Sequence, residues 1–189
     1  LDKYISFTIN NMRCEFRTMN KIDVSQGYID GLKDQNRYIE NVPVNVSISS
    51  QKKYIQEIIN SKKKTICGLF LEGKLVGTAG IQLINSNSSN QDFKVDNNKM
   101  ATIGIFVFSK SCRGKGMGKT LVWAATFLFH NTIKSEWYGA GMEKDNIPSY
   151  KSFLSCGFNC VDNSDKYYRL KVNISNLKKP KFIKKVIIF

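Results

Sequence analysis

Short alternating or apolar-rich segments predict that much of the chain is β-strand. Side chains alternate between the two faces of a strand, so a segment of this kind can present one face to a core. The first four such segments are 4–9, 13–19, 65–71 and 75–83. Asn10-Asn11 separates the first pair and Glu72-Gly73-Lys74 the second, and residues of these types favour tight turns. Each pair is therefore predicted to form a β-hairpin.

Apolar residues at helical spacing predict helices between and after these strands. Those of segment 50–60 recur with the period of a helix, and Ser49 can cap its first turn. Segment 147–156 has Pro148 in its first turn and Gly157 after its last, as helices often do. The other predicted helices are a short one within 24–42, which leads into an irregular loop closed by Pro43, and one over 118–131.

The remaining segments complete a chain in which strands and helices alternate. Further strands are predicted over 101–108, 136–142, 158–162 and 167–172. Residues 85–99 are rich in Asn and Ser and are predicted to be a loop rather than a domain boundary. This order predicts a mixed α/β (α+β) sheet with helices on both faces. A length of 189 residues suits one domain, which we expect over 1–175, followed by a basic and apolar tail over 176–189.

The net charge of +14 indicates anionic partners without identifying them. A strongly positive field raises the local concentration of phosphates or nucleic acid. Only five of the 29 basic residues are arginine, however, and the Lys-rich, Asn-rich composition is typical of a broad compositional bias. No base-reading motif accompanies the charge, so we do not expect nucleic acid to be the partner.

Cysteine usage and hydropathy exclude other classes of protein. The five cysteines are odd in number and include no CxxC pair, which argues against a disulfide framework and a zinc site. The longest apolar stretches, 102–108 and 121–129, fall far short of the roughly 20 residues that a membrane-spanning helix needs. The sequence shows no signal-peptide pattern. We expect a cytoplasmic location and no metal.

Three glycines at alternate positions, Gly114, Gly116 and Gly118, lie between an apolar segment and a predicted helix. A Walker A loop would need its first glycine at position 113, which is Arg113. The dinucleotide-binding fingerprint needs the spacing GxGxxG, and this segment reads GxGxG. The motif that does match is Arg-x-x-Gly-x-Gly over 113–118. The alternative interpretation of the three glycines is a turn that holds no ligand.

A second motif follows, with Asn146, Ser149 and Phe153 leading to Gly157-Phe158. Together the two motifs resemble the GNAT superfamily of N-acetyltransferases, whose signature is Arg-x-x-Gly-x-Gly between a central strand and a helix. The resemblance covers about 12–172, with the specific motifs in 101–158. It implies a mixed, mostly antiparallel central sheet flanked by helices on both faces. Segment 28–40 is similar to the branch that acts on amino-sugars and to the related ribosomal-protein acetyltransferases.

The resemblance implies acetyl-CoA (coenzyme A) as the cofactor. A strand that runs into glycines and then a helix offers successive backbone N–H groups and the positive end of the helix dipole to a diphosphate. Arg113 and Lys119 could add charge-assisted contacts. In the superfamily the pantetheine arm lies beside the central strand. The expected coenzyme-binding residues are Phe106, Val107, Phe108, Arg113, Gly114, Lys115, Gly116, Met117, Gly118, Lys119, Asn146, Ser149 and Phe153.

The sequence marks the catalytic groups less clearly than the coenzyme-binding residues. A strand amide can polarise the thioester carbonyl as an oxyanion hole does, and the Phe108 N–H is the candidate. Many relatives use a tyrosine to protonate the leaving thiolate where this chain has Phe153, which has no proton to donate. Ser149 or Tyr150 could substitute, or water could supply the proton. Glu143 is the candidate base, and a surface carboxylate without a catalytic role is the alternative.

We therefore expect direct transfer of acetyl to a primary amine, with a nucleotide-linked amino-sugar as the acceptor. Two alternatives stay open, a ribosomal-protein or N-terminal protein acetyltransferase and a catalytically silent acyl-CoA-binding module. The acceptor pocket is expected from loops at 24–45 and 85–99, in a monomer or homodimer. The tail over 176–189 could touch a membrane surface, bind a partner or form a terminal strand.

Overall fold

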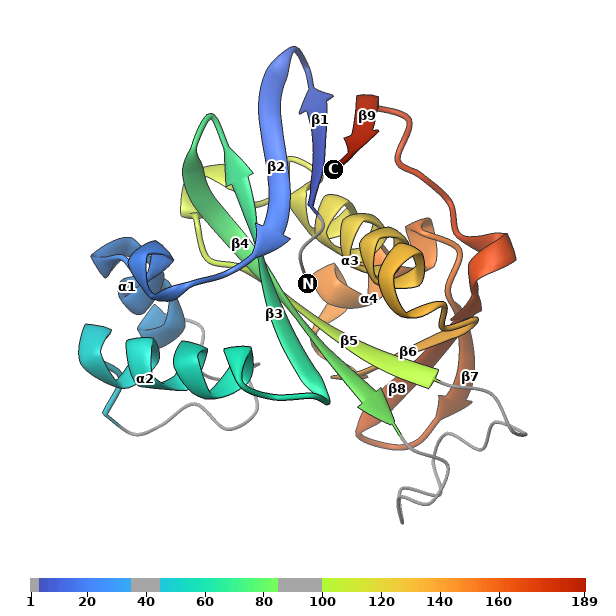
Figure 1. Ribbon diagram of the computed structural model, residues 1–189. Helices are drawn as coiled ribbons and strands as arrows, with labels where there is room; N and C mark the ends of the chain where they lie inside the picture. The colour runs from blue at the N-terminus through green and yellow to red at the C-terminus, as the bar shows by residue number, and fades with distance from the viewer. Residues whose placement is uncertain (1–3, 35–44, 85–99) are drawn as a thin grey trace.

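One nine-stranded sheet organises the described part of the molecule (Figure 1). The computed structural model describes residues 4–34, 45–84 and 100–189. The strands are β1 (Ile5–Ile9), β2 (Met12–Thr18), β3 (Lys64–Leu71), β4 (Lys74–Ile84), β5 (Met100–Val107), β6 (Trp137–Glu143), β7 (Asn159–Asn163), β8 (Tyr167–Asn173) and β9 (Ile183–Ile188). The helices are α1 (Gln26–Asp34), α2 (Ile48–Ile59), α3 (Met117–Ile133) and α4 (Ile147–Ser155). The strand order is β7-β8-β6-β5-β4-β3-β2-β1-β9.

The sheet is antiparallel except at one place, where β5 and β6 run parallel. The two predicted hairpins, β1–β2 and β3–β4, are confirmed. Their turns use left-handed backbone at Asn10 (φ 48°), Asn11 (φ 65°), Glu72 (φ 47°) and Gly73 (φ 76°). Such turns match the right-handed twist of the flanking strands, and Asn and Gly adopt their backbone conformation most readily.

Helices cover both faces of the sheet, as predicted, and each face has its own core. In Figure 1, α1 and α2 lie on one side of the sheet and α3 and α4 on the other. The larger core packs α3 against the inner side chains of the sheet, and Trp123 meets Phe7 edge to face with ring centroids 5.7 Å apart. Helix α3 is buried on several sides, and ten of its 17 residues are buried.

The smaller core lies under α1 and α2, where Tyr28, Ile55 and Ile66 are buried together with Phe108. Gly31 lets α1 approach closely, because a Cβ at this position would lie 2.3 Å from the Cβ of Phe108. Helix α1 therefore packs directly on the residue that follows β5.

Two helix starts differ from the sequence prediction. Ser47, not Ser49, caps α2, because Ser47 and Ser50 form a reciprocal capping box. The Ser50 N–H donates to Ser47 Oγ at 3.1 Å, and the Ser47 N–H donates to Ser50 Oγ at 3.0 Å. Helix α3 begins at Met117, one residue earlier than expected.

The tail contributes the terminal strand that was one of the alternatives. Strand β9 pairs antiparallel with β1 at the edge of the sheet. Phe189 stacks on Tyr4 with ring centroids 4.6 Å apart. In the described segments, no helix has the length and apolar composition needed to cross a bilayer. The predicted loop over 85–99 and the end of segment 24–42 lie outside the described residues.

Candidate active site

Strands β5 and β6 separate soon after they meet. They pair only through Met100–Thr102 and Trp137–Gly139. Beyond these pairs β5 stays paired with β4 and β6 with β8. Residues 103–107 and 140–143 therefore each have one strand edge without a strand partner. Unpaired N–H and C=O groups of this kind can bind an extended molecule that carries amide groups.

The glycine turn lies at the end of β5 and leads into α3. Gly114 (φ 74°) and Gly116 (φ 85°) have left-handed backbone, which glycine adopts without steric cost. Gly116 is the N-cap of α3 and has no side chain, so no side-chain cap occupies the first N–H groups of the helix. These N–H groups and the positive end of the helix dipole form a site that fits a phosphate or diphosphate. Lys115 and Lys119 are exposed beside it.

The three glycines have different surroundings. A Cβ at Gly114 would meet no atom of the described residues within 4 Å, so the turn is open to a ligand there. A Cβ at Gly116 would lie 2.7 Å from the ring of Phe182 in the tail. A Cβ at Gly118 would lie 2.6 Å from Ser152 Oγ on α4. The lack of a side chain at Gly116 and Gly118 therefore also lets the tail and α4 pack closely against the start of α3.

Arg113 points into the protein. Its Nε donates to the carbonyl of Val107 at 3.1 Å, and one amino group donates to the carbonyl of Phe108 at 3.2 Å. Both amino groups also donate to Asp34 Oδ2 at 3.2 Å. Lys110 pairs with the other oxygen of Asp34 at 3.0 Å. Hydrogen bonds from Lys110 and Arg113 hold the pKa of Asp34 below its ordinary value of 3.8.

The residues after β5 present their backbone to the opening. The Phe108 side chain is buried in the smaller core, and its ring meets that of Tyr28 at 5.5 Å. Among the described residues, the hydrogen bonds outside the strand ladders include none donated by the Phe108 N–H. That N–H therefore remains available to a ligand. Phe106 and Val107 are half-buried.

Asn146 caps α4 where β6 ends. Its Oδ1 accepts the Ser149 N–H at 3.3 Å, and its own N–H donates to the carbonyl of Glu143 at 3.0 Å. The capping role that asparagine often has is thus realised here. Glu143 is exposed and Ser149 half-buried at this corner of the sheet.

Tyr150 and Phe153 are packing residues in this structure. Tyr150 stacks on Tyr168 with ring centroids 4.2 Å apart. Phe153 is 1% exposed and meets Phe158 edge to face at 4.9 Å. Met117, like Phe153, has a buried side chain and can reach a ligand through its backbone only.

The structure brings the ends of β5 and β6 together with the starts of α3 and α4. Three residues that contact this site, Asp34, Ser152 and Phe182, are absent from the sequence-based set. Each contacts the site from a segment distant in the chain, and no local motif marks it.

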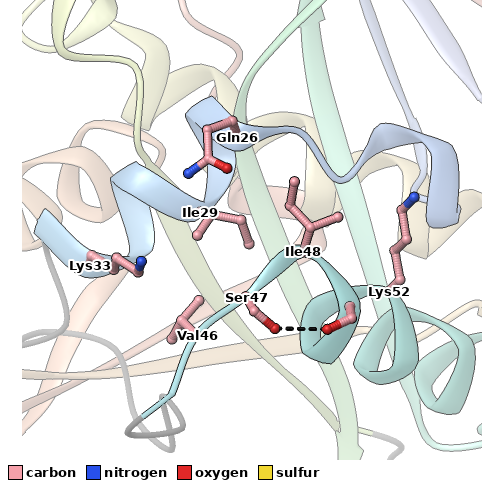
Figure 2. A pocket seen from close by; sticks show the side chains of 8 residues that line it. Gln26, Ile29, Lys33, Val46, Ser47, Ile48 and Lys52 are labelled. Carbon is pink, nitrogen blue, oxygen red and sulfur yellow. Dashed lines mark hydrogen bonds between the residues drawn. The ribbon is translucent and has the colours of Figure 1, made fainter.

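A pocket of about 540 Å³ lies between α1 and the start of α2 (Figure 2). Its lining is Gln26, Ile29, Lys33, Val46, Ser47, Ile48, Ser49 and Lys52. The Ser47 and Ser49 hydroxyls lie 3.0 Å apart along its edge. It uses residues of the expected acceptor segment 24–45 but none of the predicted coenzyme-binding or catalytic residues.

Three buried cysteines, Cys14, Cys67 and Cys156, are thiols at neutral pH. Burial raises the pKa of Cys14 and Cys67 to about 12 and that of Cys156 to about 11. A protonated thiol is a poor nucleophile, so these three side chains are unsuited to forming an acyl intermediate. Among the described residues, no group of three or more His, Cys, Asp or Glu side chains could hold a metal ion.

Solved structures share this fold at low sequence identity. RimJ of Mycobacterium smegmatis in complex with CoA-disulfide has a TM-score of 0.74 and 14% identity, over 94% of this chain and 90% of that one. Aminoglycoside acetyltransferase AAC(6')-Ib in complex with coenzyme A and kanamycin has a TM-score of 0.68 and 16% identity, over 86% and 96%. RimL, a ribosomal L7/L12 alpha-N-protein acetyltransferase in complex with coenzyme A, has a TM-score of 0.69 and 13% identity, over 90% and 99%.

Sequence comparison gives the family. No curated protein sequence matches the chain. The model of the acetyltransferase (GNAT) family matches residues 34–158, which include the parted strands, the glycine turn and the Asn146 cap. The chain therefore belongs to the acetyltransferase (GNAT) family and is an acetyl-CoA-dependent N-acetyltransferase.

Proposed function

We propose that this enzyme transfers acetyl directly to the primary amine of a nucleotide-linked amino-sugar. The observation that carries the proposal is the parting of β5 and β6 next to the uncapped start of α3. Those two features support a slot for an extended amide-bearing arm beside a site for a diphosphate.

The residues at this slot would bind the amide groups and the diphosphate of coenzyme A. The coenzyme supplies the acetyl group as a thioester on an arm that contains amides. The unpaired edge of β5 at 103–107 binds that arm, and the N–H groups of Gly114 and of the first turn of α3 bind the diphosphate. Asn146 adds a side-chain contact at the start of α4. The Phe108 N–H donates to the thioester carbonyl oxygen as negative charge develops on it.

Glu143 is the proposed general base. The substrate amine must lose a proton to attack, and the Glu143 carboxylate accepts it directly or through water. The new N–C bond forms as the C–S bond breaks. The departing thiolate takes its proton from the Ser149 or Tyr150 hydroxyl. Among the described residues, neither hydroxyl makes a hydrogen bond.

The charge of the protein favours an acceptor that carries negative charge. At +14, the chain repels polycations and attracts anions. A nucleotide-linked amino-sugar combines a reactive amine with a negatively charged diphosphate. An aminoglycoside such as kanamycin, which accompanies AAC(6')-Ib in its complex, carries several positive charges instead.

A protein N-terminus is the second candidate acceptor. RimL acts on a protein α-amine, and an α-amine has a reference pKa near 8 against about 10.4 for lysine. It therefore loses its proton more easily. Glu143 is the single candidate base, and removing a proton from an α-amine demands less of it than removing one from a lysine side chain.

The purified enzyme should acetylate nucleotide amino-sugars from acetyl-CoA, with the product identified by its mass. Kanamycin and peptides with free N-termini complete the acceptor panel. Glu143→Gln should slow the reaction by about 100-fold, whereas Glu136→Gln, an exposed carboxylate just before β6, should not. Acetylation of peptides and not of sugars would overturn the proposed acceptor.

A further inference from the structure

Three glycines on neighbouring strands leave one row of the sheet without side chains. Gly80 on β4 pairs directly with Gly104 on β5. Gly141 on β6 lies two residues beyond Gly139, the partner of Thr102, and is therefore on the opposite side of the opening between the parted strands from Gly104. All three glycines of the row are exposed. A Cβ at any of them would meet no atom of the described residues within 4 Å.

The row faces away from α3 and lies beside the parted strands. Ala79 and Ile103 are buried in the core under α3, so Gly80 and Gly104, next to them in sequence, face the other side. On β6 the buried residues Ala140 and Met142 alternate in the same way with Gly141 and Glu143. The proposed base therefore projects from the same face of the sheet as the glycine row.

Packing does not explain these three glycines. Gly77 shows the contrast, because a Cβ there would lie 2.8 Å from the carbonyl oxygen of Phe106. Glycine in a strand interior loses stability because it packs no side chain and orders a flexible backbone. A strand glycine with open space above it is typical of a place where another molecule approaches the backbone closely.

We infer that Gly80, Gly104 and Gly141 keep a floor clear for the acceptor and determine its specificity. The inference rests on the proposed function and deepens it by naming the residues that would contact the ring of the amino-sugar. On the same face, Phe106 lies two residues from Gly104 and forms an apolar wall. Thr102 lies two residues away in the other direction, and its hydroxyl contacts the carbonyl of Gln82 at 3.4 Å.

A sugar ring fits this combination of surfaces. Its flat C–H face can lie on bare backbone, its edge can contact Phe106, and its hydroxyl groups can bond to Thr102 and Gln82. The amine would then project toward the parted strands, where the acetyl group is held.

Filling the floor should weaken acceptor binding and leave coenzyme binding intact. Gly80→Val adds bulk above the row and raises β-propensity, so the variant should fold with an undiminished melting temperature. Gly80 lies on β4, outside the β5 edge proposed to bind the coenzyme arm. The KM of Gly80→Val for the amino-sugar should rise about tenfold or more. Gly80→Ala should show a smaller rise, and the KM of Gly104→Ala is a second test from the neighbouring strand. The dissociation constant of the two Gly80 variants for coenzyme A, measured by calorimetry, should stay unchanged.

Lys184→Val is the control, because Lys184 is exposed on β9 at the edge of the sheet, outside the expected acceptor segments. An unchanged KM in both Gly80 variants and in Gly104→Ala would overturn the proposed acceptor floor. So would a loss of coenzyme affinity equal to the rise in KM. A wild-type enzyme that acetylates no amino-sugar would instead overturn the proposed function.

Discussion

Arg113 holds the end of β5, the strand proposed to bind the coenzyme arm. Its guanidinium holds the carbonyls of Val107 and Phe108, and Asp34 holds the guanidinium. The residues it fixes include the N–H proposed to stabilise the developing negative charge. Sequence reasoning assigned Arg113 to the phosphates, and its contacts with the Val107 and Phe108 carbonyls lead us to propose that it also positions the end of β5.

Asp34→Asn should lower kcat severalfold and change the melting temperature little. The substitution keeps the shape of the side chain and removes the charge that orients Arg113, whose charge-assisted bonds are roughly twice as strong as neutral ones. A positioning role predicts an effect on kcat, with the KM for the acceptor close to that of the wild type. Steady-state kinetics and thermal unfolding check this.

The pH dependence of this ion pair follows from the lowered pKa of Asp34. A carboxylate with a lowered pKa stabilises the folded protein above its ordinary pKa of 3.8 and loses that effect as the pH falls through the folded value. The pair should therefore stay intact at pH values above 3.8 and be lost only as the pH falls below that value.

For the kinetic comparison, Asp30→Asn, a charge change on the exposed side of the same helix, is the control. Equal kinetics for the Asp34 and Asp30 variants would contradict the positioning role.

At the scale of elements, the start of α3 touches the middle of α4 through Gly118 and Ser152. The Ser152 hydroxyl donates to the carbonyl of Pro148 at 2.8 Å and lies where a side chain at Gly118 would project. The glycine thus lets α4 pack closely against the start of α3.

Gly118→Ala should destabilise the protein by about 1 kcal/mol, because the Ser152 hydroxyl must turn away and lose its hydrogen bond. Coenzyme affinity should fall at the same time. Adding Ser152→Ala removes the oxygen that clashes, so the double variant should regain stability. Denaturant unfolding of both single variants and the double variant gives the coupling between the two sites. Strictly additive effects would show that the contact is unimportant.

Local patterns predicted the elements well, and contacts between distant segments could not be predicted. The hairpin turns at Asn10 and Gly73 and the glycine turn carry their backbone requirements in a few adjacent residues. The start of α2 was misplaced because three nearby serines can each cap a helix and only the tertiary geometry selects Ser47. The parting of β5 and β6 depends on the register in which the strands pair. The Asp34–Arg113 pair joins segments far apart in sequence. No local sequence pattern predicts either feature.

At the scale of the molecule, the C-terminal tail reaches both the sheet edge and the ligand site. Strand β9 covers the edge of β1. Before it, the Lys178 N–H donates to the carbonyl of Cys156 at 2.9 Å, and Phe182 lies against Gly116 at the start of α3. The last residues of the chain therefore support the turn proposed to bind the diphosphate.

Phe182→Ala should weaken coenzyme binding and lower the free energy of unfolding by about 1 to 3 kcal/mol, since it removes a half-buried ring. The loss of the ring leaves Gly116 and the helix start less firmly placed. Ile187→Ala, at a 53% exposed position of β9, should change neither quantity. Calorimetry with coenzyme A and thermal unfolding distinguish the two variants. If Phe182→Ala bound the coenzyme as tightly as the wild type, the tail would stabilise the sheet without supporting the glycine turn.

The short β5–β6 junction has a mechanical consequence. The sheet is continuous there through only three residue pairs, and the larger core under α3 joins β1–β5 and β9 to β6 and β8. A molecule bound between the parted edges would add contacts across this gap. Coenzyme binding should therefore stabilise the junction between the two parts of the sheet.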